Sequence, residues 1–197
     1  MKIAHVFVHA GTESEYLKEF GEIHGYGLEF ETTINFDKSF TVDLTENDLK
    51  EQYDFGLFHP PCQKWAKATV DKHLEQNLIP RARELGEKYC DYYIIENVPK
   101  APLRDSVTLN GAMFDKGIRY ERQFESNFEI KKPEYKDRVR YDHNIQSMRK
   151  VQAGNIKEYQ SGYYHVNTIK RNATPKYYLK YLLSYCPLFD IENPLKS

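Results

Sequence analysis

The sequence predicts an α/β protein, a three-layer sandwich whose central sheet is mostly parallel. Two observations predict it. Short apolar runs typical of strands alternate with segments of helical spacing through about residue 100. The run DYYIIENV (91–98) is continuously apolar in its middle, as expected of a strand that is covered on both faces. With 197 residues, a single domain over 1–197 is expected.

The individual elements follow from local patterns of apolar residues, prolines and capping residues. Apolar and β-branched runs predict strands at 3–10, 26–31, 39–44, 53–58 and 91–98. Helical spacing and caps predict helices from Ser14, over 44–52 after a cap at Thr45, over 69–90 with a break near Pro80, and over 175–186 with Pro175 in the first turn. The segment between 100 and 175 is less regular.

Composition points to a globular chain in a reducing compartment. The sequence is 40% hydrophobic and 29% charged, and no run approaches the length of a membrane helix. Its first residues do not have the form of a signal peptide. The three cysteines are odd in number and widely spaced, which argues against a disulfide framework. We therefore expect a cytoplasmic location and no contact with membranes.

Charge gives only a local signal for nucleic acid. The formal net charge is −1, so the chain as a whole is not basic. Between residues 131 and 150, however, basic residues outnumber acidic ones, and two tyrosines lie among them. This stretch is either a solvated surface loop or a patch that contacts phosphates. Its candidate contacts are Lys131, Lys132, Lys136, Arg138 and Arg140.

Five candidate site residues fall at or near the carboxyl ends of the predicted strands, where open α/β sheets bind ligands. They are Gly11, Glu29, Asp43, Cys62 and Glu96. Cys62 follows Pro60 and Pro61, each of which fixes its own φ angle and removes a backbone donor. A buried structural thiol does not need such a rigid loop. A thiol that must be positioned to react with a substrate atom does need such a rigid loop.

Four segments in order resemble the cytosine-C5 DNA methyltransferases, especially their short phage and prokaryotic members. FHPPCQKWA (58–66) resembles the loop that carries the nucleophile, and YYIIENVPKAPL (92–103) resembles the ENV motif. LNGAMFDKGIRYERQFESN (109–127) and RNATPKYYLKYL (171–182) resemble the later motifs. The resemblance implies a class I methyltransferase (Rossmann-like) fold that binds S-adenosylmethionine and methylates C5 of cytosine in DNA.

The resemblance also implies roles for single residues. Cys62 would add as a thiolate to C6 of the base, with Glu96 at N3 and Arg122 holding the site. The pKa of Cys62 is expected below its ordinary value if the segment 66–74 begins a helix pointing at it. In the opening motif, His5 and His9 replace an acid and a glycine. The implied cofactor contacts are Phe7, Ala10, Gly11, Glu29, Asp43, Pro60 and Asn172.

Target recognition is the least defined function. Residues 128–170 form a short basic insert where larger relatives carry a recognition domain, and Gln63 is a further candidate for contact with DNA. We expect a monomer, and a partner subunit for recognition stays open. His73, His143 and His165 lack metal-ligand spacing, so no metal site is expected. Two other readings remain: an enzyme that modifies C5 of a pyrimidine nucleotide or an unusual base, and a catalytically weakened relative that acts as a binding protein.

Overall fold

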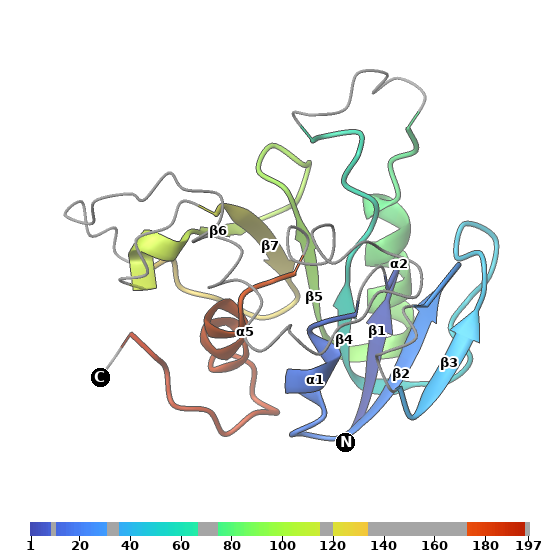
Figure 1. Ribbon diagram of the computed structural model, residues 1–197, viewed down its shortest axis with the longest axis horizontal. Coiled ribbons are helices and arrows are strands. Elements are labelled where there is room, and N and C mark those ends of the chain that lie inside the picture. Colours follow the sequence, from blue (N-terminus) through green and yellow to red (C-terminus); the bar gives the residue numbers. More distant parts are fainter. Residues whose placement is uncertain (9–10, 31–35, 67–74, 115–119, 134–172, 196–197) are drawn as a thin grey trace.

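A seven-stranded sheet forms the centre of the molecule (Figure 1). The computed structural model describes residues 1–8, 11–30, 36–66, 75–114, 120–133 and 173–195. The strands are β1 (Lys2–Val6), β2 (Glu22–Gly27), β3 (Lys38–Thr41), β4 (Tyr53–Phe58), β5 (Cys90–Asn97), β6 (Val107–Leu109) and β7 (Arg122–Ser126). The helices are α1 (Ser14–Leu17), α2 (Ile79–Tyr89), α5 (Lys176–Leu183) and the 3-10 helix η1 (Gly111–Phe114). None of the described helices is long and apolar enough to cross a membrane.

The strand order is β3-β2-β1-β4-β5-β7-β6. β1 pairs in parallel with β2 and β4, and the parallel pairing continues to β3 on one side and β5 on the other. β7 runs antiparallel to both of its neighbours. The predicted mostly parallel sheet is therefore confirmed. Because the chain moves outward in opposite directions from β1 and β4, their carboxyl ends flank the position at which such sheets bind ligands.

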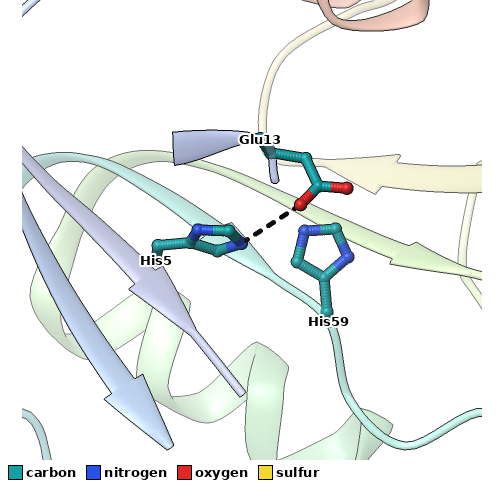
Figure 2. Close-up of side chains that lie close together, drawn as sticks. All are labelled: His5, Glu13 and His59. Atoms are coloured by element: carbon teal, nitrogen blue, oxygen red, sulfur yellow. Dashed lines mark ion pairs between the residues drawn. The ribbon is translucent and has the colours of Figure 1, made fainter. Parts of the chain in front are cut away.

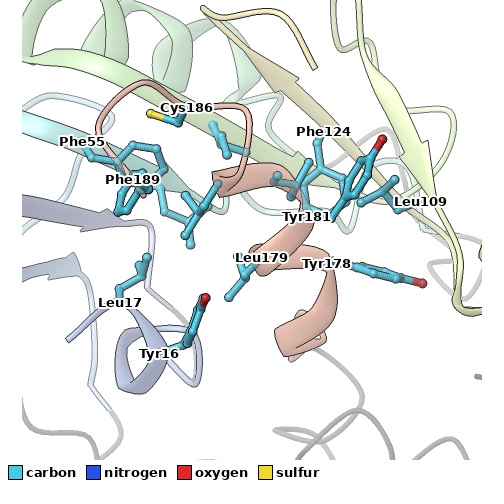
Figure 3. Packing of buried hydrophobic residues seen from close by; sticks show 14 of the residues in the cluster. Tyr16, Leu17, Phe55, Leu109, Phe124, Tyr178, Leu179, Tyr181, Cys186 and Phe189 are labelled. Carbon is cyan, nitrogen blue, oxygen red and sulfur yellow. The ribbon is translucent and has the colours of Figure 1, made fainter. Parts of the chain in front are cut away.

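Two apolar clusters cover the two faces of the sheet and make three layers. On one face, Leu17 of α1 and Tyr178 of α5 share a buried cluster with Phe55 of β4 (Figure 3). On the other face, Ala82 and Leu85 of α2 lie in a second buried cluster. Each helix thus contributes an apolar stripe to one side of the sheet, as the predicted sandwich requires.

The predicted strands at 53–58 and 91–98 correspond closely to β4 and β5, whereas the predicted strand at 26–31 was placed too late. β2 begins at Glu22 and ends at Gly27. Because β2 contains polar residues, the apolar pattern that indicates a strand is weak there. The fully buried imidazole of His24 is hydrogen-bonded to Glu22 at 2.6 Å and to the Tyr53 hydroxyl at 3.0 Å, so one partner on β2 itself and one on β4 make its burial possible.

The helix predicted over 44–52 is wrong. Asp43 accepts hydrogen bonds from the backbone N–H of Thr45 at 2.9 Å and from its hydroxyl at 2.7 Å. This local bonding offers the backbone a turn in place of a helix. Thr45 is consequently a donor to the preceding aspartate and does not cap a helix.

Two other helices differ from their predictions at the start. α1 has only four residues, and Ser14 is its first residue, with a hydroxyl that bonds to His5 instead of capping the helix. α2 begins at Ile79, so Pro80 stands in the first turn and does not break the helix. A proline is tolerated there because the first helical N–H groups have no partner within the helix. Part of the predicted segment 69–90, residues 69–74, lies outside the described residues.

A buried ion pair ties α2 to the antiparallel edge of the sheet. Arg83 donates from Nε and an Nη nitrogen to the two carboxylate oxygens of Glu125 in β7, at 2.6 and 2.8 Å. The backbone N–H of Arg104 donates to the same carboxylate at 2.7 Å. Arg83 and Glu125 are 8% and 4% exposed. Because both charges are buried and mutually satisfied, removing one of them leaves the other without compensation.

Candidate active site

A cavity of about 700 Å³ lies at the carboxyl ends of β1 to β5. It brings together eight of the residues singled out in the sequence, which come from five different strand ends. These are Phe7, Gly11, Glu29, Asp43, Pro60, Cys62, Gln63 and Glu96. The predicted residues Ala10, Lys136, Arg138, Arg140 and Asn172 lie outside the described part of the chain.

The loop that carries Cys62 is fixed at both ends. At its start, the His59 N–H donates to the Val6 carbonyl at 2.9 Å. At its middle, the buried side chain of Asn97 donates from Nδ2 to the Pro60 carbonyl at 2.9 Å. The Cys62 carbonyl then accepts the Ala66 N–H at 2.9 Å, which makes a helical turn. Together with the two prolines, these bonds hold the thiol at a defined position on the cavity wall.

Glu96, at the carboxyl end of β5, lies between two basic side chains. Its Oε2 lies 3.1 Å from His59 Nδ1, and its Oε1 lies 2.8 Å from Arg122 Nε. The second contact is an ion pair whose alignment is not that of a hydrogen bond, and Oε1 has no hydrogen-bond partner among the described residues. The Arg122 guanidinium also lies over the Tyr120 ring, 4.0 Å from its centroid. Tyr120 therefore gives Arg122 a packing surface.

The pKa of Cys62 is raised above its ordinary value. Burial is the largest cause, and the negative charge of Glu96 adds to it, while Arg122 acts in the opposite direction. The helix that was expected to lower this pKa falls partly on residues 67–74, outside the described ranges. The ligand-free protein thus holds Cys62 as a neutral thiol near pH 7.

Alkylation of Cys62 should show this environment directly. Because only the thiolate reacts, we expect the iodoacetamide rate at Cys62 to rise with pH through a midpoint above 9.0, its ordinary pKa. Glu96→Gln removes a negative charge and should move the midpoint down, whereas Arg122→Met removes a positive charge and should move it up. Peptide mass spectrometry over a pH series measures both. Equal midpoints in the two variants would contradict the assigned electrostatics.

The opposite end of the cavity has the acids expected of a nucleoside site. Glu29 follows β2 and is exposed, and Asp43 follows β3 with its carboxylate bonded to Thr45. The Thr45 hydrogen bonds lower the pKa of Asp43, so it is ionised at neutral pH. Phe7 and Gly11, either side of the undescribed residues 9–10, both have positive φ angles, 56° and 64°. The chain after β1 therefore turns sharply at the cavity.

Sequence reasoning missed a group formed by His5, Glu13 and His59 (Figure 2). Burial and the neighbouring His59 lower the pKa of His5 to about 3, against the opposing effect of Glu13. Burial acts to lower the pKa of His59, but Glu13 and Glu96 outweigh it, so that pKa is raised. Burial acts to raise the pKa of Glu13, and the two histidines outweigh it, so that pKa is lowered. The only sequence signal was the replacement of an acid by His5.

The predicted nucleic-acid contacts are only partly placed. Lys131 and Lys132 are exposed after β7, and Gln63 is exposed on the cavity loop. The remaining basic residues of the 131–150 stretch fall in the range 134–172, which the structure does not describe. Because β7 runs antiparallel to β5, it leads toward the amino end of β5 before Lys131 and Lys132, whereas Gln63 lies at the cavity.

Comparison with known proteins finds weak structural similarity. No family model and no curated protein matches the sequence. A candidate DNA modification methyltransferase from an E. coli prophage aligns at 13% identity with a TM-score of 0.49, covering 66% of this chain and 49% of that one. S. pombe Dnmt2 aligns at 12% identity with a TM-score of 0.45, and a Spodoptera frugiperda DNMT2 mutant aligns at 16% identity with a TM-score of 0.47. Each alignment covers 66% of this chain and 52% of the other protein.

The chain thus spans about half the length of these three proteins. The strand order and the antiparallel β7 define the fold. The residues of the cavity are the basis for any proposed activity. A seven-stranded sheet of this order between two helical layers, with its cavity at the carboxyl ends of the strands, is the class I methyltransferase (Rossmann-like) fold.

Proposed function

We propose that this protein is a DNA methyltransferase that transfers a methyl group from S-adenosylmethionine to C5 of cytosine. One observation carries the proposal. Cys62, on a loop tied to β5 by Asn97, lines the same cavity as Glu96. A positioned thiol and a buried carboxylate are the two groups that addition to a pyrimidine C5–C6 bond needs.

The cavity residues fit S-adenosylmethionine. The Glu29 carboxylate would accept the ribose hydroxyls, and Asp43 would lie near the adenine amine. Phe7, Gly11 and Pro60 line the same space and would contact the cofactor. Ala10 and Asn172 would complete the set from outside the described residues. When bound, S-adenosylmethionine supplies an electrophilic methyl group.

The protein's own groups act on the base. Cys62 would lose its proton and add through Sγ to C6, which makes C5 nucleophilic. Glu96 Oε1 would hydrogen-bond at N3 and offset the charge that develops there. A proton on Glu96 would also remove the negative charge that raises the pKa of Cys62. Arg122 would hold Glu96 in place. The thiol proton would pass to water in the cavity, and C5 would then take up the methyl group. Loss of the C5 proton to water would break the bond between Sγ and C6 and release the thiolate.

The substrate we propose is DNA. Its phosphates would be contacted by Lys131 and Lys132, with Lys136, Arg138 and Arg140 in the short insert at 128–170, and Gln63 would approach the flipped base. In this proposal the chain is one domain and acts as a monomer, with a partner subunit for target recognition left open. It acts in the cytoplasm, which is that of the host if the chain is phage-encoded.

Transfer of labelled methyl groups tests the proposal. The purified chain is incubated with labelled S-adenosylmethionine and either duplex DNA or dCMP, and the products are identified after digestion. Label in 5-methylcytosine of DNA supports the proposal. Label only in dCMP would favour the nucleotide-modifying enzyme, and no label with both ligands bound would favour a weakened relative that only binds.

The cofactor assignment makes a separate prediction. Glu29→Ala should weaken S-adenosylmethionine binding by about 1.5–3 kcal/mol, because charged hydrogen bonds to the ribose are lost. Calorimetry measures the change. Glu46→Ala is the matched control, since Glu46 is also an exposed glutamate but does not line the cavity. Equal affinities for the two variants would remove Glu29 from the cofactor site.

A further inference from the structure

Two buried side chains and one partly buried side chain converge near the carboxyl end of β1. His5 lies in β1, Glu13 precedes α1, and His59 follows β4 (Figure 2). His5 and Glu13 are 1% and 5% exposed, and the side chain of His59 is 14% exposed. One ligand atom from each lies within 4.8 Å of the others, and all three residues line the cavity.

The two imidazole Nε2 atoms are buried and lack hydrogen bonds in the part of the chain that the structure describes. His5 Nε2 faces the Glu13 carboxylate at 3.9 Å, too far for a hydrogen bond. Buried polar atoms without partners are uncommon in native proteins and call for an explanation. The Nε2 atoms of His5 and His59 both face the Glu13 carboxylate, which indicates that a ligand is held between these three side chains.

The other polar atom of each side chain is already fixed. His5 Nδ1 lies 2.6 Å from the Ser14 hydroxyl, and His59 Nδ1 lies 3.1 Å from Glu96 Oε2. Glu13 Oε1 accepts the backbone N–H of Thr174 at 2.6 Å. Metal-binding histidines usually donate their second N–H to an oxygen in this way, which leaves the first nitrogen for the metal. All three side chains are thus held with one atom toward a common point.

We propose that His5 Nε2, His59 Nε2 and a carboxylate oxygen of Glu13 bind one divalent transition-metal ion. Two imidazoles and a carboxylate suit Zn²⁺, Fe²⁺ or Co²⁺, whereas Mg²⁺ and Ca²⁺ prefer oxygen ligands alone. Ligand atoms around such an ion lie about 3.0–3.4 Å apart, given bond lengths of about 2.0–2.1 Å. The three atoms must therefore draw together by about 1 Å or less per ligand, which side-chain rotation can supply.

The ion would tie the start of α1 to two segments that the bond from the His59 N–H to the Val6 carbonyl already joins. These two segments are β1 and the loop after β4. Three protein ligands leave coordination positions on the side of the cavity, where water or a donor atom of a bound molecule can complete the shell. Through His59 the site also fixes the orientation of Glu96. The metal site stands on its own geometry and does not depend on the proposed methyl transfer.

Titration with metal alone tests the site. The chelator-treated chain, free of DNA and methyl donor, is titrated with Co²⁺ in a spectrophotometer and with Zn²⁺ in a calorimeter. We expect one equivalent to bind, with the visible bands of Co²⁺ on imidazole nitrogen. His5→Ala and Glu13→Gln should weaken binding by about 100-fold, and Ser14→Ala by about 10-fold because it only orients His5.

Two controls separate this site from other outcomes. The triple variant His73→Ala, His143→Ala and His165→Ala removes histidines outside the described residues and should leave affinity unchanged. Zn²⁺ should raise the unfolding temperature of the wild type but not of Glu13→Gln, which keeps the shape of the side chain. Absence of binding at millimolar Co²⁺ and Zn²⁺, or binding that survives His5→Ala, would overturn the proposal. Methyl transfer is measured separately, so either result can fail without the other.

Discussion

Cys62→Ala is expected to abolish the covalent complex that the protein forms with DNA containing 5-fluorocytosine in the presence of S-adenosylmethionine. Fluorine at C5 cannot leave as a proton does, so the sulfur that has added to C6 stays attached after methyl transfer. A band resistant to denaturing electrophoresis measures the complex. Binding of S-adenosylmethionine to Cys62→Ala should persist, because the thiol is not among the proposed cofactor contacts.

Cys90→Ala and Cys186→Ala are the matched controls. Burial raises the pKa of Cys90 to about 12 and that of Cys186 to about 11, and neither residue lines the cavity. Both variants should trap DNA like the wild type, while Glu96→Gln should slow trapping by orders of magnitude. A complex that persists in Cys62→Ala would falsify the assignment of the nucleophile. A wild type that binds both ligands without trapping would show that the site lacks this chemistry.

Glu125→Ala is expected to lower the free energy of unfolding by about 3–5 kcal/mol, the effect of leaving one buried charge unpaired. The substitution removes both hydrogen bonds from Arg83 and the one from the Arg104 N–H. Denaturant titration followed by circular dichroism measures the change. The loss is larger than that expected for an exposed pair, which contributes about 0–1 kcal/mol.

Two variants test whether burial is the cause. Asp48→Ala removes an exposed carboxylate that also bonds to two basic side chains, Arg81 and Lys88, and should change stability little. The double variant Arg83→Met with Glu125→Leu replaces both charges by apolar groups and should recover much of the loss. If Glu125→Ala proved no more harmful than Asp48→Ala, the ion pair would not be an essential link between α2 and β7.

The sheet could be predicted from the sequence where its strands are apolar on both faces. The strands β4 and β5 could be predicted because the runs YDFGLF and YYIIENV are apolar enough to indicate burial on both faces. β2 was misplaced because its buried His24 depends on Glu22 and Tyr53, and the pairing of polar groups across strands is not visible in local pattern. The sequence predicts a helix after Asp43 where the structure has a turn, because the side-chain bonds to Thr45 compete with helical ones.

The convergence of Cys62, Glu29, Asp43 and Glu96 could be predicted, since parallel strands bring their carboxyl ends to one edge. The group of His5, Glu13 and His59 could not. Its members come from three segments that are distant in sequence, and their contact depends on how β1, α1 and the loop after β4 pack. The direction of the Cys62 pKa shift depends in the same way on burial, a tertiary property.

The hydrogen bond from the Thr174 N–H to Glu13 joins residues 161 positions apart, and this has a consequence for biosynthesis. Glu13 leaves the ribosome early, yet its carboxylate is not fixed until α5 has emerged and packed beside α1. At about 5–20 residues per second, synthesis of the chain takes roughly 10–40 s. For most of that time the β1 face that α5 will cover stays open to water. The nascent chain should therefore bind chaperones that recognise apolar surface until α5 has emerged.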